Sequence, residues 1–201
     1  MGRRGARAAF MPSKHVFPGG AVDPGDASAR FGTPLPASEA EALRDESEVP
    51  PGALAAAAIR ELWEESGLRL SVPGAWPDPP PDWAGFAAGG HLPHAAALRF
   101  VFRAITPPGR LRRFDARFLM ADAEALAGDP DDFSASDDEL SGLAWIPLEE
   151  AGALDLPFVT EVALAEVAAR LSGVPRPGGV PFFRNDDEAS LLLYLGRAAQ
   201  D

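Results

Sequence analysis

One segment of the chain combines strong helix formers with a regular spacing of apolar residues. In residues 53–66, ALAAAAIRELWEES, apolar side chains recur at steps of three and four, which would make one side of a helix apolar. Pro51 stands in a position typical of a first helical turn, and Gly67 follows as a stop signal. The pattern predicts a helix with one face packed against a core.

Alternating apolar and polar residues predict strands further along the chain. Residues 96–106 and 113–123 alternate in this way around the turn-rich sequence PPGR, so they would form a hairpin or lie as neighbouring strands. A short strand is predicted at Leu143–Ile146, and a helix from about Thr160 to Leu171 that Gly173 ends. Strands and helices in this mixed order indicate a layered α/β or α+β domain.

Two segments near the N-terminus lack such a pattern. Residues 16–26, VFPGGAVDPGD, have the Gly and Pro density of a tight loop. Residues 27–52 are rich in Ala, Ser, Pro and acidic residues without an apolar period, which predicts an exposed loop or insertion. We therefore expect one domain, residues 1–201, with an insertion at about residues 27–52.

Composition narrows the class of protein. A chain of 201 residues with 46% hydrophobic content is large enough to bury one core of ordinary size. No apolar run is long enough to cross a bilayer, and the basic N-terminus lacks the apolar segment of a secretory signal, so we expect a soluble, cytoplasmic protein. The absence of cysteine excludes disulfides, thiolate nucleophiles and cysteine-ligated zinc.

The charge of the chain limits its partners. A formal net charge of -12 argues against general nucleic-acid binding, which relies on surplus Lys and Arg. Ten of the 18 basic residues nevertheless lie in two short stretches, residues 3–14 and 99–117. Such local clusters suit a small polyanionic ligand better than a long one, although any single arginine is more often a solvated surface charge.

The predicted helix carries three glutamates on one face. Glu61, Glu64 and Glu65 are spaced i, i+3 and i+4, and each like-charged pair costs roughly 0.2 to 0.5 kcal/mol on an exposed helix. Arg60 could neutralise only one of these charges, whereas a divalent cation could bind two or three carboxylates at once. Hard oxygen ligands favour Mg²⁺, with Mn²⁺ as a substitute. Taken alone, however, such a cluster would more often be a solvated acidic face.

The loop and the helix together resemble the signature of the Nudix hydrolases. Residues 60–68, RELWEESGL, match the second half of that signature at every fixed position. The loop supplies Gly20 and, at the position of the family's first glutamate, Asp26. Residues 27–59 intervene where the family has only seven positions. Closing the longer loop costs about 1.4 kcal/mol, which a folded domain tolerates.

The interruption resembles the Nudix subgroup that includes peroxisomal coenzyme A diphosphatases. FMPSKHVFPGG and RRFDARFLM are similar to segments of that subgroup, whereas Ala9 and Ser13 stand where the coenzyme A signature has Arg and Gly. The substrate therefore stays open between coenzyme A or acyl-coenzyme A and ADP-ribose, NADH or a dinucleotide. The resemblance implies a mixed β-sheet between helices. Only 16 residues precede Phe17, so we expect that part of the first strand is missing.

The resemblance also implies roles for individual residues in metal-dependent hydrolysis of a diphosphate linkage in a nucleoside diphosphate derivative. Three carboxylates would bind the metal and an arginine would orient them, which gives a predicted catalytic set of Arg60, Glu61, Glu64 and Glu65. The loop would support the helix through Gly19, Gly20 and Asp26. The alternative is a catalytically weak module that binds a nucleotide or a protein partner.

Candidates outside the signature each have an ordinary structural reading. An acid or base could come from the acidic loop, which otherwise caps the next element: Asp137, Asp138 and Glu139. Substrate phosphates could be held by arginines that are equally credible as surface charges: Arg4, Arg112 and Arg113. A base could stack on aromatic residues that more often pack: Trp76, Trp83 and Phe86. We expect a small-molecule ligand and no membrane binding, and a homodimer is compatible with the sequence.

Overall fold

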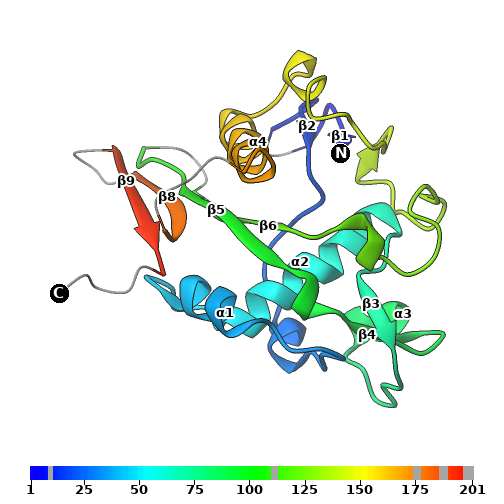
Figure 1. The fold of residues 1–201 in the computed structure, drawn as a ribbon. Coiled ribbons are helices and arrows are strands. Elements are labelled where there is room, and N and C mark those ends of the chain that lie inside the picture. Colours follow the sequence, from blue (N-terminus) through cyan, green and yellow to red (C-terminus); the bar gives the residue numbers. More distant parts are fainter. Residues whose placement is uncertain (9–10, 110–112, 174–177, 186–189, 197–201) are drawn as a thin grey trace.

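The computed structural model describes residues 1–8, 11–109, 113–173, 178–185 and 190–196 (Figure 1). The strands in this part of the chain are β1 (Gly2–Arg4), β2 (His15–Val16), β3 (Ser71–Pro73), β4 (His91–Pro93), β5 (Arg99–Ile105), β6 (Asp115–Met120), β7 (Leu140–Ser141), β8 (Val180–Asn185) and β9 (Ser190–Leu195). The α-helices are α1 (Ala37–Arg44), α2 (Pro51–Ser66), α3 (Ala84–Ala87) and α4 (Phe158–Leu171). Short 3₁₀ helices include η1 (Pro24–Ser28) and η2 (Pro81–Trp83).

The largest sheet has the strand order β6-β5-β8-β9. Its pairs are antiparallel except for β5 and β8, which run parallel, so the sheet is mixed. A smaller sheet has the order β2-β1-β7, and β3 pairs with β4. Figure 1 shows the four-stranded sheet with α1 and α2 on one side and α4 on the other. The expected mixed sheet between helices, in an α+β fold, is therefore confirmed.

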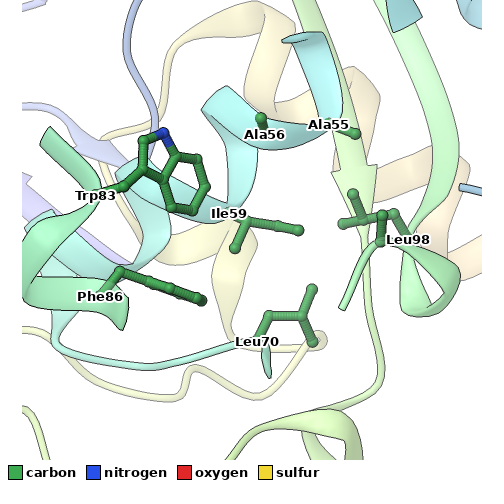
Figure 2. Close-up of a cluster of buried hydrophobic side chains, with 8 residues drawn as sticks. Ala55, Ala56, Ile59, Leu70, Trp83, Phe86 and Leu98 are labelled. Atoms are coloured by element: carbon green, nitrogen blue, oxygen red, sulfur yellow. The ribbon is translucent and has the colours of Figure 1, made fainter. Parts of the chain in front are cut away.

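Helix α2 forms as its sequence predicts and supplies one wall of the core. Pro51 occupies its first turn, and Gly67 ends it in the left-handed conformation at φ 77°. On its apolar side Ala55, Ala56 and Ile59 are fully buried. Figure 2 shows these residues among Leu70, Trp83, Phe86 and Leu98. Trp83 and Phe86 are thus core residues with no exposed face for a base, and Trp76 packs against the same cluster.

The two long predicted strands are confirmed as antiparallel neighbours, β5 and β6. The buried Arg103 of β5 donates two hydrogen bonds to Asp115 and one each to the carbonyl oxygens of Asp45 and Glu46. Its guanidinium also lies 4.3 Å from the centre of the Phe182 ring. One side chain therefore ties the end of α1 to three strands of the sheet.

Two elements differ from the sequence expectation. Residues 27–52 are not simply an exposed loop, because they contain α1, whose Leu43 is only 1% exposed and packs near Phe100. The strand predicted at 143–146 is wrong: β7 ends at Ser141, since its partner β1 is short and Gly142 turns the backbone at φ 62°. The predicted helix near Thr160 is confirmed and begins at Phe158.

Among the helices of the described ranges, none has both the length and the apolar character needed to span a membrane.

Truncating the core residue of α2 should destabilise the fold far more than truncating an exposed apolar residue. Ile59→Ala should lower the free energy of unfolding by about 2 to 5 kcal/mol, because the buried methyl groups leave a cavity among aromatic neighbours. Leu171→Ala, at a residue 69% exposed, should change it by less than about 0.5 kcal/mol. Urea unfolding followed by circular dichroism measures both, and equal losses would contradict the packing described.

Candidate active site

The glutamate face of α2 lies against the glycine loop near residue 19. The backbone N–H of Gly19 donates to Glu65 Oε2 over 2.7 Å. A Cβ atom at Gly20 would overlap the carboxylate of Glu61, so an alanine there would displace that carboxylate. The loop therefore contacts two of the three glutamates, and at Gly20 the approach to Glu61 leaves no room for a side chain.

Arg60 is buried at 2% exposure and holds the site together with five hydrogen bonds. Its Nη1 donates to Glu61 Oε1 and to Glu64 Oε2, each over 2.8 Å. Its other two nitrogens donate to both carboxylate oxygens of Asp26, over 3.0 and 3.1 Å, and to the Ala21 carbonyl. Arg60 thus hydrogen-bonds to three carboxylates, although its single positive charge can neutralise only one of them.

Asp26 reaches Arg60 although it is shorter than the family's glutamate. It lies in η1, where the residue is 1% exposed, and the Asp23 N–H donates to its Oδ2 over 2.8 Å. The 34-residue separation of Asp26 and Arg60 along the chain is therefore closed by a direct, bidentate ion pair. Burial disfavours the charged guanidinium, but the bonds and charges of Asp26 and Glu61 outweigh burial and raise the pKa of Arg60.

The three glutamates carry more negative charge than their surroundings neutralise. Burial raises the pKa of Glu61 and of Glu64, against the opposing effect of Arg60. Burial also raises the pKa of Glu65 to about 7, helped by the charges of Glu139 and Glu61, and opposed by the Gly19 N–H and Arg4. A bound cation would relieve this excess charge.

The residue types on the glutamate face suit a divalent cation, whereas the positions of these side chains do not form a metal site. In the part of the chain described by the structure, no three His, Cys, Asp or Glu side chains stand in positions that could hold a metal ion. Glu61 and Glu64 instead each turn one oxygen toward Arg60. Three carboxylates on one helix face are the hard oxygen ligands that Mg²⁺ and Mn²⁺ prefer, so Glu61, Glu64 and Glu65 are the residues that could hold the metal.

Two candidates from outside the signature come together beside this face. Arg4 Nη2 lies 2.5 Å from Glu139 Oε1 in an ion pair. The loop that carries Glu139 packs on the end of α2, because the Asp137 N–H donates to the Glu64 carbonyl over 2.9 Å. Both members of the ion pair act electrostatically on Glu65, so they belong to the surroundings of the site.

Among the candidates that the structure describes, Arg113 does not join the site. Arg113 donates to the Thr106 carbonyl at the connection between β5 and β6, and Arg112 lies outside the described residues. Ser13, which stands where the coenzyme A signature has Gly, adopts φ 62°, a left-handed conformation that glycine enters without strain. Ala9 also lies outside the described residues.

Sequence reasoning missed two aspartates whose charges reach the glutamates. Asp23 Oδ2 is 3.5 Å from Arg60 Nη2, and the charges of Asp82 and Asp23 raise the pKa of Glu64. Asp23 lies in the glycine loop, so the loop sequence could have indicated it. The position of Asp82 depends on the burial of its neighbour Trp83, and no local sequence pattern reveals that burial.

Two known proteins are similar to this chain over different shares of its length. No family model matches the chain. It is 36% identical to the acyl-coenzyme A diphosphatase NUDT19 of Gallus gallus, in a match covering 37% of this chain and 26%, about a quarter, of that protein. A crystal structure of a Nudix hydrolase from Alicyclobacillus acidocaldarius is 30% identical, with a TM-score of 0.59 and a match covering 83% of this chain and 82% of that one.

The fold and the site define an α+β protein in which a glutamate-bearing helix lies against a glycine loop beside a mixed sheet. With the likeness to the solved hydrolase over most of both chains, the chain belongs to the Nudix hydrolase family.

Removing the charge of Asp26 should weaken the fold at the point where loop and helix meet. Asp26→Asn leaves Arg60 buried with one carboxylate fewer, and should lower the free energy of unfolding by about 3 kcal/mol. Asp78→Ala removes an exposed carboxylate and should change it by less than about 0.5 kcal/mol. Denaturant unfolding in EDTA compares the two, and an Asp26→Asn protein as stable as the parent would refute the role of the ion pair.

The raised pKa of Glu65 predicts that stability without metal falls as pH rises. The folded protein keeps a proton on Glu65 to about pH 7, whereas the unfolded chain releases it near the ordinary value of 4.5. The folded state therefore binds more protons between these values, and the free energy of unfolding decreases across them. Unfolding in EDTA at pH 5 and pH 8 should show a smaller decrease for Glu65→Gln than for the parent. The same decrease in both proteins would contradict the shift.

Proposed function

We propose that the protein hydrolyses a diphosphate linkage in a nucleoside diphosphate derivative, with Mg²⁺ or Mn²⁺ as cofactor. The observation that carries this proposal is that three glutamates share one face of α2 against a glycine loop. The buried Arg60 holds Glu61 and Glu64, and the Gly19 N–H holds Glu65. Membership of the Nudix hydrolase family supports the same reaction.

Each residue of the site would have a distinct task. Glu61, Glu64 and Glu65 would hold the cation, which when bound neutralises diphosphate oxygens and lowers the pKa of a water molecule. Arg60, anchored by Asp26, would keep the carboxylates oriented. Gly20 leaves room for the Glu61 carboxylate.

The reaction adds the oxygen of water to one phosphorus, and the bridging oxygen leaves with the other phosphate group. The proton released by the water needs an acceptor beside the glutamates. Glu139 is the candidate for this acceptor, since its charge acts on Glu65 and its partner Arg4 already holds it in place.

Coenzyme A or an acyl-coenzyme A is the substrate that we place first. It is supported by the name of the chicken relative and by the glycine-like conformation of Ser13 at the signature position. ADP-ribose, NADH and dinucleotides carry the same diphosphate linkage and are the alternatives.

We also propose that residues 1–201 form one Nudix domain, interrupted at about residues 27–52. Support comes from α1, which lies within the interruption and packs on the core that α2 and the sheet share. The hydrogen bonds of Arg103 to the carbonyls of Asp45 and Glu46 fix the end of this segment to the sheet. The interruption would then be a docked element rather than a separate unit.

Removing one of the carboxylates should abolish metal-dependent hydrolysis. The parent protein is incubated with Mg²⁺ or Mn²⁺ and with coenzyme A, acetyl-coenzyme A, ADP-ribose, NADH or a dinucleoside polyphosphate, and the nucleotide products are separated by chromatography. Glu64→Gln should lower the rate by more than about 100-fold, beyond the usual loss for residues that only support metal ligands. EDTA should stop the reaction of the parent.

A matched control separates this effect from a simple change of charge. Glu161→Gln removes an exposed carboxylate from α4, and should retain the parent rate. A parent protein that turns over no substrate, or a Glu64→Gln protein as active as the parent, would favour the alternative of a nucleotide-binding module. That alternative is supported by the hydrogen bonds of Arg60 to Glu61 and Glu64. With these bonds in place, no three described side chains are positioned to bind a metal ion.

A further inference from the structure

A cavity of about 480 Å³ lies between the N-terminal turn and the loop of Glu139. Its lining is Arg4, Gly5, Ala6, Arg7, Ala8 and Glu139. The volume is in the range of small-molecule sites, but among the described residues the lining contains no aromatic side chain on which a base could stack. Its polar side chains are two arginines and one glutamate, so the cavity suits an anionic group.

The backbone around the cavity is held by the small sheet. Strand β1 is paired on both sides, with β2 and with β7, and the Arg4 N–H donates to the Lys14 carbonyl over 2.9 Å. The Ala8 N–H donates to the Gly5 carbonyl over 3.0 Å, which closes the turn that carries Arg7. The two arginines are thus presented by a strand end and a closed turn.

The two arginines differ in how far they are neutralised. Arg4 is paired with Glu139. The guanidinium of Arg7 makes no hydrogen bond or ion pair with any residue in the described ranges, and it lines the cavity. The cavity therefore carries one positive charge that no described residue compensates, in a protein whose net charge is -12. A free guanidinium in these surroundings can bind an anion by charge-assisted hydrogen bonds.

The cavity adjoins the Glu65 end of the candidate active site. Arg4 and Glu139, which line the cavity, are also the charged groups that act on Glu65 from outside α2. The loop before Glu139 is hydrogen-bonded to the last turn of α2 through Asp137 and Glu64. A substrate whose diphosphate lies at the glutamates could therefore extend into the cavity.

We propose that Arg7, with Arg4, binds a second anionic group of the substrate, a phosphomonoester or a carboxylate that lies outside the diphosphate being cleaved. This inference rests on the proposed function, because it assigns the cavity to the same substrate. It adds selectivity: among molecules with the same diphosphate linkage, those with a further anion would be preferred.

Pairs of substrates that differ by one anionic group test the subsite and identify the group. Coenzyme A and dephospho-coenzyme A differ by a phosphomonoester, and malonyl- and acetyl-coenzyme A differ by a carboxylate. The cavity should distinguish one of these pairs. For the more anionic member of that pair, Arg7→Ala should lower kcat/KM about tenfold, because one charge-assisted hydrogen bond is lost. The change should come mainly from a higher KM. The less anionic member should change less than about twofold. Equal losses for both members of each pair would overturn the subsite.

Arg3→Ala is the matched control for charge. Arg3 precedes Arg4 in β1, so its side chain lies on the opposite face of the strand, and its Nε donates to the Ser13 carbonyl. This variant also removes one positive charge but should retain the preference of the parent for the more anionic member. Loss of the preference in Arg3→Ala as well would indicate a general charge effect and overturn the subsite.

Equilibrium binding separates failure of the subsite from failure of the proposed function. Calorimetry in EDTA with Glu64→Gln protein, with and without Arg7→Ala, uses the same four compounds and needs no turnover. Tighter binding of the more anionic compound that is lost in Arg7→Ala supports the subsite. If the parent protein binds in this way but hydrolyses none of the compounds, the proposed function alone fails. Hydrolysis by the parent without any difference that depends on Arg7, in rate or in binding, overturns the subsite alone.

Discussion

The buried guanidinium of Arg60 is the interaction on which the rest of the site depends. It pairs with Asp26 of the loop segment on one side and with Glu61 and Glu64 of α2 on the other. Loop and helix are therefore joined through one side chain. A guanidinium suits this position because its planar array of donors can satisfy several carboxylates at fixed angles, which an ammonium group cannot. Because the carboxylates outnumber the arginine, the site keeps an excess of negative charge that burial makes costly. The same contact thus shapes the site and leaves it suited to a cation.

The interruption of the signature is bridged by packing on both of its sides. On one side, η1 brings Asp26 to Arg60, and on the other α1 packs with Leu54 of α2 against the sheet. Arg103 adds polar anchors where α1 ends, while its ring contact with Phe182 shields it from water. The long chain between the two halves therefore costs little, because its ends are fixed by independent contacts. Asp26 and Arg60 are therefore in contact although they lie 34 residues apart in sequence.

The site has two ends of different electrostatic character. At one end Asp23 and Asp82 add negative charge near Glu64, and at the other Arg4 and Glu139 form an ion pair near Glu65. Arg7 adds a positive charge beyond that pair. A diphosphate with a cation suits the acidic centre, whereas a further anionic group suits only the arginine end. The direction in which a substrate would lie along α2 follows from this asymmetry.

The sequence by itself determined α2, the two long strands and the family resemblance, because these depend on local periodicity and on motif residues close together in the chain. Only the tertiary structure decided that Asp26 reaches Arg60, since the approach depends on η1 and on residues far apart in sequence. It also decided that Trp83 and Phe86 belong to the core, that Asp82 lies near Glu64, and that β7 is Leu140–Ser141. Composition cannot distinguish a stacking aromatic from a packed one, or a free arginine from a paired one. The helix and the family were therefore readable in the sequence, whereas the partners of the helix charges were set by long-range contacts.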